Sequence, residues 1–235
     1  MKHLTLCLGC VFALTAGSHA AITYVDASDT NTSGNGTPPS PTGGNIYNDN
    51  RWSLRTVGST GADIVNNNVF EAGPLEPSSS VNENAPLLTT TVSGLTPGQS
   101  YQMFVYFVSQ DASGTGQVWQ VDAGLNPASL MFFNPNTTRG FEVGQIQQLP
   151  GGSSTYFANA VTVPSNRNYF QGNLGTAVAN DSGEVQVFVD APTGDINNNG
   201  NRRSWYDGVG FEAVPEPSTA LLSLVGMTFL LRRRR

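Results

Sequence analysis

Short runs of alternating hydrophobic and polar residues, separated by Gly, Asn, Ser, Thr and Pro, fill the chain between residues 21 and 213. Such runs are typical of β-strands bounded by turns. Apolar residues at helical spacing without a helix breaker do not occur there, so we expect no helix between Ala21 and Val214. The expected strands are 22–25, 52–57, 63–71, 87–92, 100–109, 117–122, 129–133, 141–148, 156–163, 184–190 and 204–214.

The strand expected at 100–109 is apolar on both faces. One face carries Met103, Val105 and Phe107, and the other carries Phe104, Tyr106 and Val108. A strand of this kind belongs in the centre of a sheet, not at its edge. Pro97 and Gly98 precede it as a turn, because proline presets φ and glycine supplies a positive φ. Leu95 is expected to fill the core beneath that turn.

Four other segments carry specific expectations. Strand 184–190 alternates Val185, Val187 and Val189 with polar residues, so one side should be buried. Strand 204–214 should place Trp205, Val209 and Phe211 on one face, and Trp52 should face inward. Residues 26–50 are rich in Ser, Thr, Asn, Gly and Pro, which predicts a flexible loop or linker.

These strands predict an all-β fold, a single β-sandwich at residues 21–213. The sequence SGLTPGQSYQMFVYF, which starts at Ser93, resembles a hairpin of fibronectin type III domains and of galactose-binding-like jelly rolls in carbohydrate-binding modules. Fibronectin and constant-type immunoglobulin domains have roughly seven strands, fewer than we expect here. The jelly-roll class is therefore favoured.

The last part of the chain, residues 214–235, has the composition of a targeting signal. It consists of Val214, Pro215, Glu216 and Pro217, an apolar run from Ala220 to Leu231, and Arg232, Arg233, Arg234 and Arg235. The two prolines favour an extended motif outside the fold. As a helix, the apolar run would rise only ~20 Å, short of the ~30 Å hydrocarbon core. The arginines would snorkel to the interface and stay cytoplasmic, which suits a short, transient membrane insertion.

This order of Pro-Glu-Pro, apolar run and arginine cluster resembles the PEP-CTERM sorting signal of Gram-negative bacteria. The resemblance covers only the tail. It implies a membrane-embedded exosortase that recognises and cleaves the tail, in cells that make an extracellular polysaccharide. An ordinary tail anchor is the alternative.

Residues 1–20 predict a signal peptide that is removed by signal peptidase. Lys2 is followed by an apolar run from Leu4 to Ala16 and by Ser18-His19-Ala20, a small-x-small cleavage site. A lipoprotein signal at Cys10 would leave too short an apolar region. We expect export across the inner membrane, transient anchoring, and then a location at the cell surface or outside the cell.

Composition restricts the chemistry of the exported part. Both cysteines, both histidines and Lys2 lie in the signal peptide. This excludes a Ser-His-Asp or Cys-His nucleophilic centre, a histidine or thiolate zinc site and a disulfide framework. Between Ala21 and Val214, sixteen acidic residues face six arginines. Nucleic acid is therefore not an expected partner, whereas Ca²⁺ and neutral sugars are compatible.

Two groups of oxygen ligands could hold a structural Ca²⁺. Asp195, Asn197 and Asn199 stand at alternate positions with Gly sixth, as in an EF-hand loop, although the twelfth position is Tyr206. An Asn-Gly hairpin turn explains the same residues without a metal. The second group follows from the jelly-roll resemblance, which implies Ca²⁺ between the first and last strands. It comprises Asp26 and Asp29 with Asp207 and Glu212.

Aromatic residues supply the candidates for sugar binding, because rings stack on the C–H faces of sugars. Trp119 and Tyr106 are these candidates, with burial in the core as the favoured alternative for each. No dense carboxylate cluster lies on a single strand, which argues against a glycosidase. We expect a non-catalytic structural or adhesive protein. The alternatives are a carbohydrate-binding module for exopolysaccharide and a carboxylate-based glycoside hydrolase.

Overall fold

The computed structural model describes residues 21–34, 52–56, 68–72, 86–109, 120–133, 146–153, 156–159, 161–163, 168–191 and 204–215. All regular structure in these ranges is β, and none of them contains a helix. The strands are β1 (Thr23–Asp26), β2 (Thr32–Gly34), β3 (Ser53–Thr56), β4 (Asn68–Ala72), β5 (Leu88–Val92), β6 (Ser100–Ser109), β7 (Val121–Gly124), β8 (Met131–Phe133), β9 (Ile146–Leu149), β10 (Asn168–Val178), β11 (Val185–Asp190) and β12 (Ser204–Ala213). The expected all-β class is confirmed.

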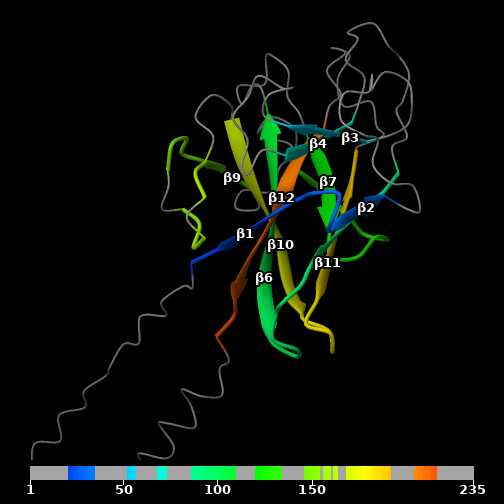
Figure 1. The fold of residues 1–235 in the computed structure, drawn as a ribbon, viewed down its shortest axis with the longest axis vertical. Helices are drawn as coiled ribbons and strands as arrows, with labels where there is room; N and C mark the ends of the chain where they lie inside the picture. The colour runs from blue at the N-terminus through cyan, green and yellow to red at the C-terminus, as the bar shows by residue number, and fades with distance from the viewer. Residues whose placement is uncertain are drawn as a thin grey trace, which may run out of the picture.

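The strands form two antiparallel sheets that resemble a β-sandwich (Figure 1). The seven-stranded sheet has the order β3-β4-β12-β6-β10-β9, and β1 adds to β12. The five-stranded sheet has the order β2-β5-β11-β7-β8. β4 and β1 pair with successive halves of β12, at Ser204 to Tyr206 and at Gly208 to Phe211. The first and last strands of the domain are therefore neighbours.

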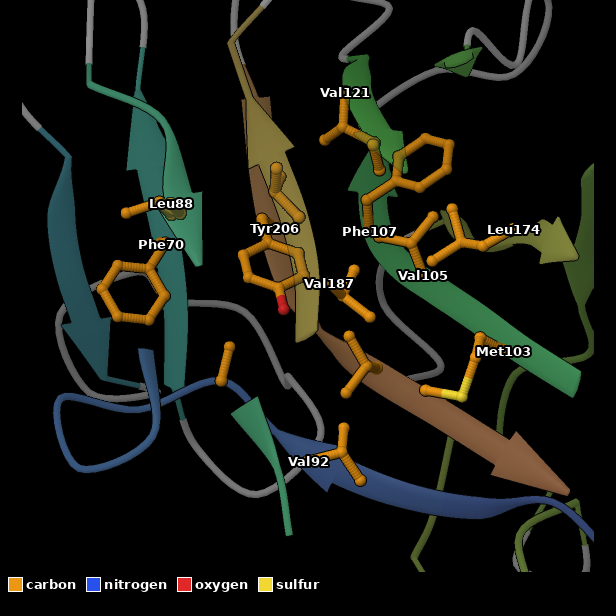
Figure 2. Packing of buried hydrophobic residues seen from close by; sticks show 14 of the residues in the cluster. Phe70, Leu88, Val92, Met103, Val105, Phe107, Val121, Leu174, Val187 and Tyr206 are labelled. Atoms are coloured by element: carbon orange, nitrogen blue, oxygen red, sulfur yellow. The ribbon is translucent and has the colours of Figure 1, made fainter. Parts of the chain in front are cut away.

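The main hydrophobic core lies between the two sheets. Figure 2 shows Met103, Val105 and Phe107 of β6 in this core with Val187 of β11. Val185 and Val189 point the same way, while Gln186 between them is exposed, as the alternation in β11 predicted. Trp52 and Leu95 are also buried, which confirms both expectations.

β6 is central, as predicted, and a second core explains its other apolar face. β6 lies between β12 and β10. Phe104, Tyr106 and Val108 pack on the outer side of the seven-stranded sheet in a cluster with Tyr24 of β1 and Phe157. A parallel bridge between Ile22 and Phe157 joins the covering segment to the chain just before β1. Both faces of β6 are therefore shielded from water between Met103 and Ser109.

Three local predictions were wrong. β10 was not predicted, because Gln171, Gly172 and Asn173 interrupt its apolar pattern. Gly172 has a packing role instead, since a Cβ there would lie 2.7 Å from the Phe133 ring. β2 lies within the segment that was expected to be a loop, where it pairs with β5 at the edge of its sheet. The strand expected at 156–163 is reduced, in its described residues, to the single bridge at Phe157.

A β-bulge in β12 overturns the predicted facing of that strand. Tyr206 pairs with Phe107 and Gly208 pairs with Tyr106, so Asp207 is an extra residue without a cross-strand partner on β6. One inserted residue reverses the side-chain alternation. Trp205 therefore lies in the outer cluster, whereas Val209 and Phe211 belong with the inter-sheet core.

Candidate functional site

The bulge in β12 carries Asp207, a fully buried carboxylate that lies between two tyrosine hydroxyls. Asp207 is 0 % exposed. Its Oδ2 accepts hydrogen bonds from the hydroxyl of Tyr24 at 2.8 Å and from the hydroxyl of Tyr169 at 2.5 Å. Bulges re-aim side chains in this way, and they are frequent next to functional sites. Residues 24, 169 and 207 thus meet although they are far apart in the sequence.

Backbone pairing positions both tyrosines. Tyr24 lies opposite Gly210 in the β1–β12 pair, and Asn159 clamps its backbone. The Tyr24 N–H donates to Asn159 Oδ1 at 3.2 Å, and Asn159 Nδ2 donates to the Tyr24 carbonyl at 2.8 Å. Tyr169 projects from β10, where it pairs with Val108 of β6. Gly208 leaves room for the contact, since a Cβ there would lie 2.6 Å from the Tyr24 hydroxyl oxygen.

Burial dominates the electrostatics of this cluster. It raises the pKa of Asp207 well above its usual value, and the nearby carboxylate of Asp26 raises that pKa further. The hydrogen bonds from Tyr169 and Tyr24 act in the opposite direction. Burial, followed by the charge of Asp207, also raises the pKa of both tyrosines. The two phenols therefore remain protonated donors at neutral pH.

One oxygen of Asp207 has unused bonding capacity. Oδ1 is buried, and none of the described residues forms a hydrogen bond with it. Asp26 is half-buried, and its Oδ1 lies 3.3 Å from the Tyr24 hydroxyl oxygen. The carboxylates of Asp26 and Asp207 therefore both lie next to this hydroxyl. An unpaired buried carboxylate oxygen beside a second carboxylate can be stabilised by a proton or by a cation.

The cluster fits a Ca²⁺ ion only in part. Ca²⁺ takes six to eight oxygen ligands. Over the ranges that the structure describes, no group of three or more His, Cys, Asp or Glu side chains could hold a metal. Asp26 and Asp207 could supply carboxylate oxygens, and the remaining ligands would have to be carbonyl groups or water.

The structure brings together some of the predicted metal ligands. Asp26 and Asp207 are neighbours because β1 pairs with β12, as the analogy with jelly rolls implied. Asp29 is exposed and Glu212 is half-buried further along β12. Asp195, Asn197 and Asn199 lie outside the described residues.

The aromatic candidates are corrected in part. Tyr106 is 0 % exposed and stacks on Tyr169 at a centroid distance of 5.7 Å, so its ring cannot stack on a sugar. This is the burial that the sequence analysis favoured, and it follows from the covered outer face of β6. Trp119 lies outside the described residues.

Sequence reasoning missed the tyrosines of the cluster. Tyr24 lies in a short strand pattern and Tyr169 lies in a strand that was not predicted, so neither carries a signal that points to Asp207. The available signal was Asp207 itself, a carboxylate between Tyr206 and Gly208 in a strand whose middle is mostly apolar.

A second pair of carboxylates faces the solvent side of the five-stranded sheet. Asp122 of β7 lies directly opposite Asp190 of β11. Partial burial, followed by the charge of Asp190, raises the pKa of Asp122 to about 6. Partial burial also raises the pKa of Asp190, and a hydrogen bond of 2.9 Å from the Ala191 N–H opposes that rise.

The chain leaves the fold within the predicted sorting signal. The expectation that the whole signal lies outside the fold is wrong for its first residue, Val214, which two hydrogen bonds hold to the domain. The N–H of Val214 donates to the Ser100 carbonyl at 2.9 Å, and Gln99 Nε2 donates to the Val214 carbonyl at 2.9 Å. Pro215 is exposed. Glu216, Pro217 and the four arginines lie outside the described residues, as do residues 1–20. No helix within the described ranges is long and apolar enough to cross a membrane.

No family model matches the chain, and no curated protein matches it. Among solved structures, the K2 cleaved adhesin domain of Lys-gingipain is similar at 14 % identity, with a TM-score of 0.25. That alignment covers 84 % of this chain and 93 % of the adhesin domain. A TM-score of this size does not establish a common fold.

Proposed function

We propose that this chain is an exported, non-catalytic β-sandwich that serves as a structural or adhesive component at the cell surface or in the extracellular matrix. The observation that carries the proposal is the way in which the domain ends. Val214 is the last residue tied to a sheet by the described hydrogen bonds, and the Pro-Glu-Pro motif starts at the exposed Pro215. A processing enzyme could therefore grip this motif without unfolding the domain.

The arrangement of the two ends supports the same route. Thr23 pairs with Phe211, so the start of β1 and the end of β12 lie side by side. A signal peptide before residue 21 and a sorting signal after residue 213 would then both join the domain at one end. That geometry suits a domain held briefly at a membrane while signal peptidase and an exosortase remove the two signals.

Two finer features belong to the proposal. We assign the sandwich to the jelly-roll class because of its large number of antiparallel strands. We also propose a structural Ca²⁺ held by Asp26 and Asp207. Its support is the unpaired Oδ1 of Asp207, which lies within a cluster that contains a second carboxylate.

The test of the route is pulse labelling of the chain with an epitope after Ala213 and another after Arg235. We expect a mature N-terminus at Ala21 and loss of the second epitope only in a host that carries the exosortase. Replacing both Pro215 and Pro217 by Ala should block the second cleavage but leave the first unchanged. Recovery of the uncut chain from the cytosol would contradict the proposal.

The carbohydrate-binding alternative is favoured by one observation. Two phenylalanines on the five-stranded sheet reach solvent, Phe132 at 40 % exposure and the half-buried Phe188. Exposed rings on a sheet face can stack on sugars.

A further inference from the structure

A hollow of about 540 Å³ opens beside the N-terminal half of β11. Its walls come from the turn after β7, at Leu125 to Pro127, from the end of β10, at Ala177 and Val178, and from the turn between β10 and β11. Gln186 and Phe188 of β11 line it. We refer to this hollow as the β11 groove.

The groove exists because β7 is shorter than β11. β7 pairs with β11 only at Phe188, Val189 and Asp190, and it ends at Gly124 opposite Phe188. Val185 to Val187 therefore have no strand beside them on that side, within the described part of the chain. The groove thus contains an apolar ring, that of Phe188, next to polar groups.

The polar groups of the groove include two amides with free donors. Asn126 Oδ1 accepts the N–H of Ala128 at 2.9 Å. Asn180 Oδ1 accepts the N–H groups of Ser182 and Glu184 at 3.0 and 2.9 Å. The turns thereby fix both side chains and use their oxygens. The NH₂ group of each amide has no partner among the described residues and can donate to a ligand.

The charge of the groove selects against anions. Glu184 lines it, and the Asp122–Asp190 pair lies further along β11 on the same sheet face as Phe188. Among the described residues that line the groove there is no lysine or arginine. An anionic polymer or a phosphorylated ligand would be repelled by these carboxylates and would find no cation among the described lining residues, whereas an uncharged polyol would find both hydrogen-bond donors and acceptors.

We propose that the β11 groove binds a neutral glycan. A sugar ring stacks its C–H face on Phe188, its oxygens accept from the amides of Asn126 and Asn180, and its hydroxyls donate to Gln186 and Glu184. A flat apolar face edged with hydroxyls is the ligand chemistry that an aromatic ring and surrounding amides complement. This inference rests on the proposed surface or matrix role and supplies a binding site for it.

The test is affinity electrophoresis of the full chain, in non-ionic detergent, through gels that contain soluble glycans. Neutral dextran, galactomannan and hydroxyethylcellulose are compared with anionic alginate and with a gel that contains no glycan. The variants are Gln186→Ala, which changes an exposed side chain in the groove, and Phe188→Ala. Gln147→Ala is the matched control, because Gln147 is an exposed glutamine on β9 of the other sheet.

We expect at least one neutral glycan to retard the wild-type chain and the Gln147→Ala variant. Association should be about tenfold weaker for Gln186→Ala and weaker still for Phe188→Ala. The Gln186→Ala variant guards against misfolding, because its side chain makes no core contact. Retardation by no neutral glycan, by alginate alone, or equally for Gln186→Ala and wild type would overturn the inference. Binding of an unstructured peptide instead would also overturn it. The export proposal is tested separately, by pulse labelling of the two processed ends. A failure of export would therefore change the cleavage pattern and not the retardation by glycans.

Discussion

The hydroxyl of Tyr24, in the first strand, donates a hydrogen bond of 2.8 Å to Oδ2 of Asp207, in the last strand. The two residues are separated by 183 positions and both are buried. Tyr169 completes the arrangement from a third strand, so one carboxylate joins β1, β10 and β12. The cluster lies on the outer face of the seven-stranded sheet, where β1 pairs with β12.

Removing either hydroxyl should destabilise the domain. Each of Tyr24→Phe and Tyr169→Phe takes a donor from a buried carboxylate, which should cost about 1–3 kcal/mol of the free energy of unfolding. Urea denaturation with unchanged m-values would measure the loss. The control is Tyr169→Phe in an Asp207→Leu background, where the acceptor of Tyr169 is absent. Tyr24 is less suited to this control, because its hydroxyl also lies 3.0 Å from the backbone carbonyl oxygen of residue 207. An equal loss for Tyr169→Phe in that background would show that its hydroxyl acts elsewhere.

The burial of Asp207 predicts a pH dependence of stability. Its folded-state pKa is raised, so the folded state binds this proton more tightly than the unfolded state does. Stability should therefore decrease as pH rises from about 4, the unfolded value, towards the folded pKa. Asp207→Asn removes the titration. As pH rises across this range, the unfolding free energy of the wild type should fall relative to that of the variant. A difference between the two that does not change with pH would contradict the expectation.

A bound Ca²⁺ would reverse part of that penalty. Ca²⁺ favours the ionised carboxylates of Asp26 and Asp207, and binding to the folded state alone raises stability. Addition of millimolar Ca²⁺ at pH 7 should increase the Tm of the wild-type chain, and EGTA should return it. The Asp207→Asn variant should lose most of the increase, whereas Asp29→Asn, at an exposed residue outside the cluster, should keep it. An equal increase in both variants would place the ion elsewhere.

The Asp122–Asp190 pair predicts a titration near neutral pH. Carboxyl carbon NMR should show Asp122 titrating at about 6. Asp190→Asn should lower that pKa, since it removes the repulsion, but not to 3.8, because burial is the larger cause. Asp181→Asn, at an exposed turn residue, serves as the control. An Asp122 pKa that Asp190→Asn leaves unchanged would show that burial alone causes the shift.

Two turn glycines near Leu95, Gly98 and Gly183, should differ in the stability that replacement by alanine costs. Gly183 and Gly98 both have positive φ, +71° and +76°. A Cβ at Gly183 would lie 2.3 Å from the Leu95 carbonyl oxygen, whereas a Cβ at Gly98 would meet no atom within 4 Å. Gly98→Ala should cost only about 1–2 kcal/mol of backbone strain, and Gly183→Ala clearly more. Thermal unfolding of both variants measures this, and equal costs would mean that the turn at Leu95 relaxes freely.

The sequence alone determined the β class, the central position of β6 and the burial of Trp52, Leu95 and the valines of β11. These features follow from local patterns in the sequence. In a strand, alternate side chains point to opposite faces, so the positions of the apolar residues show which face is buried. The targeting interpretation of both ends also comes from the sequence, and it remains a prediction that the described residues do not test.

Tertiary structure decided what local patterns could not encode. β10 escaped prediction because its glycines look like breakers, whereas Gly172 is small so that the Phe133 ring can pack against it. The bulge at Asp207 places Trp205 on the face opposite to the predicted one. The hydrophobic pattern did not predict the bulge, because a single extra residue does not change that pattern visibly. Tyr24, Tyr169 and Asp207 meet only through strand pairing across the whole chain. The β11 groove likewise arises from the unequal lengths of two paired strands, a property of the sheet and not of either segment.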